Sequence, residues 1–366
     1  MLEAGEASVV AVPTFHPDIL HAYVTTTCQA LGSEPREATL VADQLIRANL
    51  SGHDSHGVGM MPAYVHAAKG GKLAINQHPE VVIDAGALVV LDGHQGFGQV
   101  NGYESMELGI ARAQEHGAAV CGLRNSSHIG RIGHWGEQCA AAGMASIHFV
   151  NVIGHPPLVA PFGGADAAFS TNPFCAAVPD PDGKPAVLLD MATSIIAQGK
   201  ARVAHNKGVK VPFGSVLDPD GRLSDDPGVM FGSPRGALVA FGEHKGSGLA
   251  IMCELLGAAL LGGETAQPES PRDGRIINNM LSIIIDPAAT GSLDRFADEV
   301  AKYCAHVTGS RLREGSDAVL LPGQPEEIAR AQRAEGFEVD PTTLDQLRSC
   351  ATAAGVDDAT LSELLG

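Results

Sequence analysis

The chain has 366 residues, of which 45% are hydrophobic and 44 are glycine, and its formal net charge is −18 at pH 7. That length predicts two lobes, because single hydrophobic cores stop growing at about 250–300 residues. The negative charge argues against a nucleic-acid partner or an anionic membrane surface, since both require basic patches. No apolar run reaches the roughly 18–20 residues that a membrane span requires.

The cysteines and the opening residues bear on location. Seven cysteines are scattered along the chain without a C-x-x-C pair, which is typical of reduced cysteines in a cytoplasmic protein. Residues 1–13 carry Glu3 and Glu6 rather than a basic stretch before an apolar one, so they do not resemble a secretory signal. We expect a cytoplasmic location.

The first third of the chain is predicted to be mainly helical. Apolar residues recur at helical spacing, and Ser33 is the expected N-cap of the second helix. Helices are predicted at Asp18–Leu31, Glu34–Leu50, Val58–Ala68 and Ser105–His116, with a strand or hairpin at Glu80–Asp92.

From Ala118 onward, short apolar segments separated by Gly, Pro and His predict a sheet. Leu249–Leu261 is apolar on all sides, as a buried helix would be. Together with the amphipathic helices near the end, this alternation predicts an α/β fold. Strands are expected at Ala118–Leu123, Ala145–Val150, Ala186–Leu189, Ala237–Phe241 and Ile276–Ile285, and late helices at Asp294–Val307, Glu326–Gly336 and Leu344–Ala354.

A glycine-rich turn connects the predicted strand at Ala118 to a predicted helix at Trp135–Ala142. Its three glycines let the backbone approach a ligand, and the first N–H groups of the helix would favour an anion such as a pyrophosphate. His128 and Arg131 add a proton-transfer group and a cation. The alternative is a glycine-rich connection with a surface histidine.

A second motif, Asp54-Ser55-His56-Gly57, lies between two predicted helices. A histidine with a neighbouring hydroxyl and carboxylate could donate a proton to a reacting oxygen near neutral pH. The alternative is that Asp54 or Ser55 caps the next helix while His56 is solvated.

A third motif ends a predicted buried strand with Asp190, followed by Thr193 and Ser194. Open α/β sheets bind ligands at the carboxyl ends of their strands. If Asp190 reaches His56, its charge would favour the protonated imidazole. The alternative is that Asp190 is the N-cap of a helix.

A fourth motif, Gly242–Gly248, places His244 and Lys245 at a glycine-rich helix start. These two side chains suit a nucleotide or phosphate contact. Alone this motif would be weak, but with the turn at Asn125 it favours one anionic cofactor.

Two other site classes are disfavoured by spacing. The 15 histidines include no recognised zinc pattern, so we expect no metal. Gly93–Gly98 has the wrong spacing for the G-x-G-x-x-G fingerprint, so a standard Rossmann site is not expected.

Seven motifs in order resemble the type-2 malate/L-lactate dehydrogenase family, most closely its hydroxycarboxylate dehydrogenase branch. The likeness runs from about residue 16 to the end. The motifs are Asp54–Gly57, Ser127–Gly130, Pro161–Gly164, Thr171–Pro173, Asp190–Ser194, His244–Gly246 and Leu321–Gly323, and the branch is indicated by Ala48–Met60 and Phe149–Pro161.

The resemblance implies a non-Rossmann α/β fold and an oxidoreductase that uses NAD or NADP, with NAD favoured. It implies a mixed-sheet cofactor domain at residues 118–289 and a helical domain, for substrate and dimerisation, at 1–117 and 290–366. Members interconvert 2-oxo and 2-hydroxy acids and are usually homodimers. No partner beyond the small-molecule substrate and a second copy is expected.

The resemblance also assigns residues. His56 would donate the proton, Ser55 and Asp190 would assist it, and His128 is the second candidate acid/base. The cofactor would be lined by His56 and Lys245 together with Gly130, Arg131, Ile132, Leu188, Leu189, Asp190, Met191, Ala192, His244, Asn278, Gly323, Gln324, Pro325 and Glu326.

One position departs from the family pattern. Many members have a substrate-binding arginine four residues after the histidine of the Ser-His-Gly motif, where this chain has Met60. An apolar side chain there favours a substrate with an apolar or less charged end, such as a phenylpyruvate-like or hydroxypyruvate-like acid, anchored through Arg131 or His128.

Two competing hypotheses remain at this point. Because of Met60, a non-catalytic NAD(P)-binding protein on the same fold is the first alternative. Metal-assisted hydrolysis is the second, and the histidine spacing disfavours it.

Overall fold

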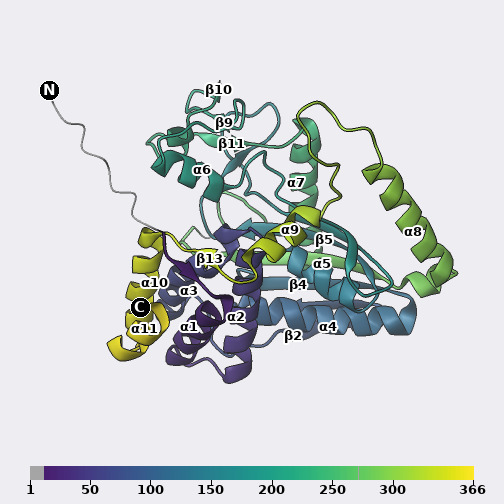
Figure 1. Cartoon of the computed structure of the whole chain (residues 1–366), viewed down its shortest axis with the longest axis horizontal. Helices are drawn as coiled ribbons and strands as arrows, with labels where there is room; N and C mark the ends of the chain where they lie inside the picture. The colour runs from purple at the N-terminus through teal and green to yellow at the C-terminus, as the bar shows by residue number, and fades with distance from the viewer. Residues whose placement is uncertain (1–11, 271) are drawn as a thin grey trace. The chain divides into compact units, whose positions relative to one another are not determined.

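The computed structural model describes residues 12–270 and 272–366, which divide into two compact units. We call residues 12–69 with 326–366 the terminal unit, and the described residues of 70–325 the sheet unit (Figure 1). The predicted domain of both chain ends included residues 70–117 and 290–325, whose contacts group them with the sheet unit. The reason is strand pairing, since β3 (Leu88–Asp92) lies parallel to β4 (Ala118–Ser127). Most of residues 1–13, on which the secretory-signal prediction rests, lie outside the described residues.

The terminal unit is built from helices. Helix α1 packs on α2 and α3 packs on α10, and the Tyr23 hydroxyl donates a 2.7 Å hydrogen bond to the Leu347 carbonyl. Leu20, Leu45 and Met61 are fully buried here. Its elements include β1 (Thr14–Phe15), α1 (Pro17–Ala30), α2 (Pro35–Leu50), α3 (Met61–Lys69), β13 (Phe337–Glu338), α10 (Pro341–Ala354) and α11 (Asp358–Leu365).

The sheet unit is centred on a seven-stranded mixed sheet with the order β2-β3-β4-β12-β5-β7-β8. Every neighbouring pair is antiparallel except β3 with β4. This confirms the predicted mixed α/β fold and the hairpin at Glu80–Asp92. The other strands are β2 (Glu80–Ala85), β5 (Ala145–Ile153), β7 (Phe174–Pro179), β8 (Pro185–Met191) and β12 (Ile277–Ile285).

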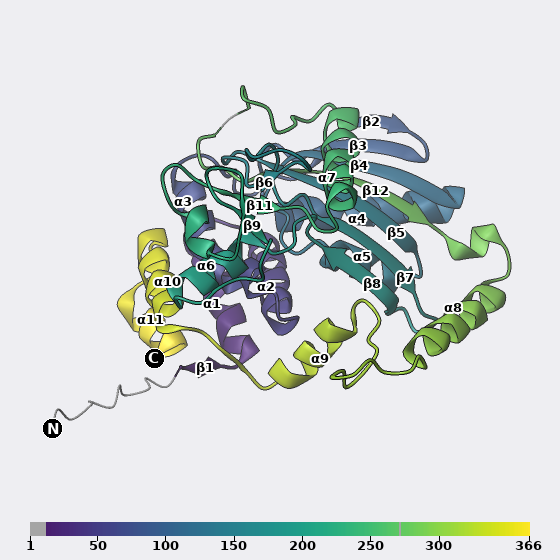
Figure 2. The same cartoon turned by 90° about the horizontal axis from the view of Figure 1, so that it is seen from above.

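Alternating side chains send one set of apolar residues to each face of the sheet, as the two-residue strand period requires. Cys121 and Met280 pack with Trp135 of α5 (Gly133–Ala141) and Met106 of α4 (Gly98–His116) in one core cluster. Val120, Leu281 and Leu256 form a separate cluster under α7 (His244–Gly257). Helix α7 therefore covers one face, across which it lies in Figure 2, and α4 and α5 cover the other.

A smaller sheet with the order β10-β9-β11-β6 completes the sheet unit. Leu158, Val216, Leu238 and Ala201 pack together between this sheet and α6. Helix α8 then begins after Ser292, whose hydroxyl accepts a hydrogen bond from the Arg295 N–H. These elements are β6 (Val159–Ala160), β9 (Val216–Leu217), β10 (Leu223–Ser224), β11 (Ala237–Val239), α6 (Gln198–Asn206) and α8 (Leu293–Thr308).

Three predictions are corrected here. Helix α2 has Glu34 as its N-cap, and the Ser33 hydroxyl instead donates to Glu37 Oε1 at 2.7 Å. Helix α4 begins at Gly98 rather than Ser105, and the ring of Trp135 lies against its first turns at Gly102, where a Cβ would clash. Helix α7 is not buried on all sides, since only one side packs on the sheet; Ile251, Met252 and Leu255 are exposed.

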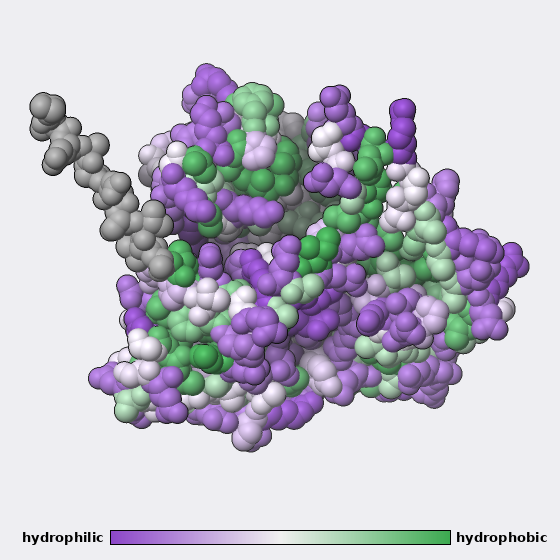
Figure 3. Space-filling view, viewed as in Figure 1, coloured by the Kyte–Doolittle hydropathy of each residue, from purple (hydrophilic) through white to green (hydrophobic). Residues whose placement is uncertain are grey.

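The face of the molecule drawn in Figure 3 is mainly hydrophilic, with separate apolar patches. Within residues 12–270 and 272–366, no helix is both long and apolar enough to cross a membrane.

Candidate active site

The His56 turn lies between α2 and α3 in the terminal unit. It is a short 3₁₀ helix, η1 (Asp54–His56), in which the Ser55 hydroxyl lies 3.0 Å from Nδ1 of His56. The Asn49 amide donates to Asp54 Oδ1 at 2.7 Å and accepts the N–H of Val58 at 2.8 Å, so it connects both sides of the turn. Gly57 lies so close to this amide that a Cβ would clash with it. The predicted serine–histidine pair is therefore present and rigidly supported.

Met60 follows directly in a second 3₁₀ helix, η2 (Val58–Met60), and is partly exposed. The apolar residue that departs from the family pattern thus lies four residues after His56, beyond the extended Gly57.

A buried ion group lies at the second predicted turn, in the sheet unit. Arg131 is 3% exposed, with its guanidinium 2.7 Å from Glu137 Oε1 and 3.5 Å from Asp190 Oδ2. Burial by itself lowers the pKa of Arg131, but the two carboxylates outweigh it and hold the pKa above its usual value. Arg131 is therefore a charged internal group in this structure, and its proposed contact with a substrate carboxylate stays a prediction.

The same group changes the expected role of the α5 N-terminus. The Gly133 N–H donates to Asp190 Oδ2 at 2.9 Å, and the next two N–H groups donate to the carbonyls of Arg131 and Ile132. A carboxylate at a helix N-terminus is favoured by the helix dipole. Asp190 thus fills the position that the sequence analysis gave to a cofactor pyrophosphate, and that expectation is wrong for this helix.

Asn278 also has an internal role. It is 2% exposed, its Oδ1 accepts the Ile129 N–H at 3.0 Å, and its Nδ2 donates to the Asn151 carbonyl at 2.9 Å. The backbone directly after His128 is therefore fixed by an asparagine of β12. Asn278 thus supports the His128 turn, and its expected place in the lining of the cofactor site stays a prediction.

Sequence reasoning missed the polar network behind that support. Asn151 contacts Asn279 and the buried carboxylate of Glu254, and Glu254 also accepts a 2.8 Å hydrogen bond from Asn172. Buried polar groups need such partners. A signal was available for two of them, because Asn151 and Asn279 interrupt the mainly apolar strands β5 and β12.

Two predicted cofactor-lining segments come together in the sheet unit. The Leu188 N–H of β8 donates to the Pro322 carbonyl at 2.9 Å. Gly323 has φ +98°, and a Cβ there would lie 3.0 Å from the Cβ of Leu188. Leu189, Met191, Ala192, Gln324 and Pro325 adjoin this contact and are at least partly exposed.

The start of α7 keeps its predicted character. His244 and Lys245 are exposed, and the Phe162 ring makes an edge contact with His244 at a centroid distance of 5.9 Å. Glu243 just before them has φ +57°, a strained conformation for a side-chain-bearing residue. This helix start is accessible to a negatively charged group.

The predicted site residues thus fall in both units. Ser55, His56 and Glu326 belong to the terminal unit, and the remaining predicted site residues, including His128 and Asp190, belong to the sheet unit. The relay between His56 and Asp190 would join residues of the two units, so it stays a prediction. Among the described residues, no group of three or more His, Cys, Asp or Glu side chains is placed to hold a metal ion.

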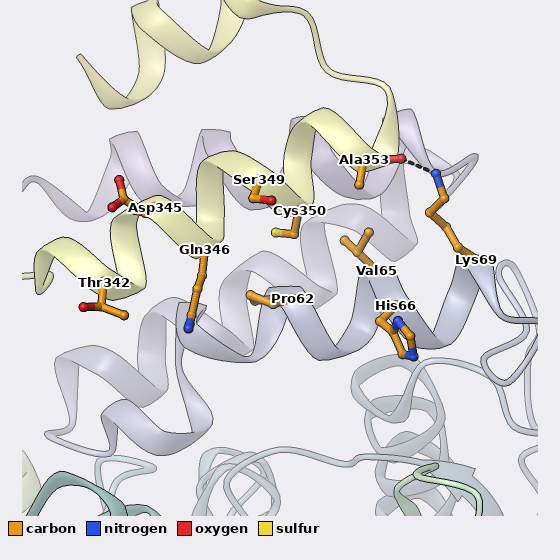
Figure 4. Close-up of a pocket in the computed structure, with 10 residues that line it drawn as sticks. All are labelled: Pro62, Val65, His66, Lys69, Thr342, Asp345, Gln346, Ser349, Cys350 and Ala353. Atoms are coloured by element: carbon orange, nitrogen blue, oxygen red, sulfur yellow. Dashed lines mark hydrogen bonds between the residues drawn. The ribbon is translucent and has the colours of Figure 1, made fainter. Parts of the chain in front are cut away.

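A separate pocket of about 620 Å³ lies between α3 and α10 (Figure 4). Pro62, Val65 and Cys350 contribute to its wall, and Lys69 at one end donates a hydrogen bond to the Ala353 carbonyl. The predicted catalytic and cofactor residues are not among its lining residues, so it is distinct from the candidate site.

Comparisons with known proteins agree with this description. The family model for malate/L-lactate dehydrogenase matches residues 15–348. Hydroxycarboxylate dehydrogenase B of Escherichia coli K12 is 47% identical over 350 residues, covering 95% of this chain and 96% of that protein. L-lactate dehydrogenase of Cupriavidus necator is 40% identical over 316 residues, covering 86% and 90%.

Solved structures give the same result. A structure from E. coli superposes with a TM-score of 0.92 at 46% identity, covering 96% of this chain and 98% of that one. The chain therefore belongs to the malate/L-lactate dehydrogenase family and is an oxidoreductase that interconverts 2-hydroxy acids and 2-oxo acids.

Proposed function

We propose that His56 is the proton donor in reduction of a 2-oxo acid and the proton acceptor in the reverse reaction. The observation that carries this proposal is the Ser55–His56 pair in its supported turn. Because the Ser55 hydroxyl engages Nδ1, proton delivery to the carbonyl oxygen is assigned to Nε2. A positioned general acid of this kind contributes about 10²–10⁴-fold in rate.

The residues of the sheet unit fit a nicotinamide cofactor. An exposed cationic helix start at His244 and Lys245 suits its phosphates. Its remaining contacts are assigned to β8 and residues 323–325, where Gly323 brings the backbone close to Leu188. When bound, the cofactor supplies or accepts the hydride. NAD is favoured over NADP.

Asp190 and His128 complete the proposed machinery. Asp190 is proposed to stabilise the protonated form of His56, and His128 is the alternative acid/base. Since Asp190 already balances Arg131, we rank Ser55 first as the partner of His56.

The substrate is proposed to have an apolar or weakly charged end, because Met60 stands near the proton donor. Phenylpyruvate-like and hydroxypyruvate-like acids meet this condition. The name of the E. coli relative, hydroxycarboxylate dehydrogenase B, supports a hydroxy acid without specifying which one.

A cytoplasmic homodimer is proposed as the working form. The exposed apolar side of α7, with Ile251, Met252 and Leu255, is a surface that a second copy would cover. All seven cysteines lie in the described part of the chain and are unpaired, which supports a reducing compartment.

The test of the proton donor is His56→Ala. We expect kcat to fall by about 10²–10⁴-fold, with the cofactor dissociation constant nearly unchanged because all but two of the residues assigned to the cofactor, His56 and Glu326, belong to the sheet unit. Steady-state kinetics and a fluorescence titration with NADH measure both quantities. His21→Ala, which removes a histidine paired with Asp43 in the same unit, is the control and should retain activity. Equal turnover in the two variants would remove His56 from the mechanism.

A further inference from the structure

Helix α9 (Gln324–Arg333) presents one polar face to the chain segment around His56. Glu326, Arg330 and Arg333 are spaced by four and three residues, so they lie on the same side of the helix. All three are partly buried, whereas Glu327, Ile328 and the other residues between them on the opposite side are exposed.

The first two of these residues contact the beginning of the turn. Glu326 Oε1 lies 3.0 Å from Nε2 of His53, and Nη1 of Arg330 donates to the Ser51 hydroxyl at 3.0 Å. Between them, a Cβ on Gly52 would lie 3.5 Å from the Cβ of Ala329. The helix therefore follows the backbone of residues 51–53 closely.

Arg333 makes the strongest set of contacts. Its Nη1 donates to the Asn49 carbonyl at 2.6 Å and to Asp54 Oδ1 at 2.7 Å, while Nη2 donates to Asp54 Oδ2 at 3.2 Å. This is the two-pronged geometry in which arginine recognises a carboxylate. The guanidinium thus connects the end of α2 with the first residue of η1, directly beside the Ser55–His56 pair.

The contact between Arg333 and Asp54 is too exposed to contribute much to the stability of the protein, but it can still orient the His56 turn. The Asp54 side chain is 55% exposed and that of Arg333 is 30% exposed. Ion pairs this exposed contribute little to the stability of a protein because water screens them. The guanidinium of Arg333 does fix the orientation of the turn, since it binds both carboxylate oxygens of Asp54 and the Asn49 carbonyl.

We infer that Arg333 is a positioning residue for the reaction, which acts by holding the His56 turn in its reactive geometry. This inference rests on the proposed role of His56. It predicts that a residue 277 positions away in the sequence, with no place in the family motifs quoted above, affects the chemical step.

The test compares Arg333→Ala, Arg333→Lys and the control Gln332→Ala, whose side chain is exposed on the opposite face of α9. We expect Arg333→Ala to lower kcat by about 10- to 100-fold, because small misplacements of a catalytic group have costs of that order. Arg333→Lys keeps the positive charge but loses the two-pronged contact with the carboxylate, so its kcat should lie between those of Arg333→Ala and the wild type. The cofactor KM and the melting temperature should stay close to those of the control.

A double variant gives the deciding readout. In a His56→Ala background, measured at high enzyme concentration, Arg333→Ala should cause no further loss, because the group that it positions is gone. The inference is overturned if Arg333→Ala and Gln332→Ala have equal kcat, or if Arg333→Ala lowers the residual rate of His56→Ala by the same factor as in the wild type. If His56→Ala alone keeps full turnover, the proposed proton donor itself is wrong and the inference falls with it. Should Arg333→Ala fail to fold, the same comparisons apply to Arg333→Lys.

Discussion

Among single residues, His148 shows how burial sets the chemistry of a side chain. It lies within the sheet, fully buried, with Nδ1 2.8 Å from the Ser282 hydroxyl and Nε2 2.9 Å from the Ser146 hydroxyl. Burial lowers the pKa of His148 to about 3. It is therefore neutral at physiological pH and part of the core.

This buried histidine makes stability depend on pH. Its folded-state pKa lies below its usual value of about 6.5, so between pH 6.5 and pH 3 the unfolded chain binds a proton that the folded chain does not. The contribution of the neutral His148 to the free energy of unfolding is fully present above pH 6.5. As the pH falls below 6.5, the free energy of unfolding decreases by about 1.4 kcal/mol for each pH unit.

The variant His148→Gln tests this. Glutamine keeps a donor and an acceptor but takes up no proton, so the difference in unfolding free energy between wild type and variant should shrink as the pH is lowered from 7 to 5. Urea denaturation at both pH values measures it. A difference that stays constant with pH would show that His148 takes up a proton as readily in the folded state as in the unfolded state.

Between elements, the ion group of Arg131, Glu137 and Asp190 connects the glycine-rich turn, α5 and β8. The two carboxylates lie on different elements, and both side chains are less than 10% exposed. Removing one partner of such a buried group leaves uncompensated charge, which typically costs about 3–5 kcal/mol.

We therefore expect Arg131→Met to lower the free energy of unfolding by about 3–5 kcal/mol, because two carboxylates would stay buried without a cation. The control is Arg112→Met, which breaks the more exposed pair with Asp84 and should cost no more than about 1 kcal/mol. Denaturant unfolding of both variants provides the comparison. Equal losses would mean that Arg131 is solvated rather than buried with its partners.

Local patterns predicted where most elements lie, but not their ends. The strand at Ala118 continues to Ser127, beyond its apolar run, because Ser126 and Ser127 still pair with β12. Helix α4 starts seven residues early, because its glycines serve close packing rather than a loop. Short strands such as β9 gave too brief a pattern to be found. Element ends are decided by tertiary partners, which a local pattern does not contain.

For the whole molecule, the motifs predicted the family, the mixed sheet and the Ser55–His56 pair. They did not predict which polar side chains form internal ion pairs and hydrogen bonds rather than contacts with a ligand. Arg131 and Asn278 have the residue types of ligand contacts, but their partners are Glu137 and the backbone of Ile129. Arg333 was missed because its contact with Asp54 spans most of the chain. Burial and distant contacts depend on the complete fold, and so the roles of these residues required the structure.

Turnover of 2-oxo acids with a nicotinamide cofactor is measured by the loss of reduced-nicotinamide absorbance. NADH and NADPH are supplied in parallel with pyruvate, oxaloacetate, hydroxypyruvate and phenylpyruvate. We expect turnover, faster with NADH, and a higher kcat/KM for hydroxypyruvate or phenylpyruvate than for the dicarboxylate oxaloacetate, because Met60 offers no charge to a second carboxylate. No turnover with any of the four acids, while cofactor binding is still detected, would contradict the proposed 2-oxo acid reduction and favour a non-catalytic cofactor-binding protein.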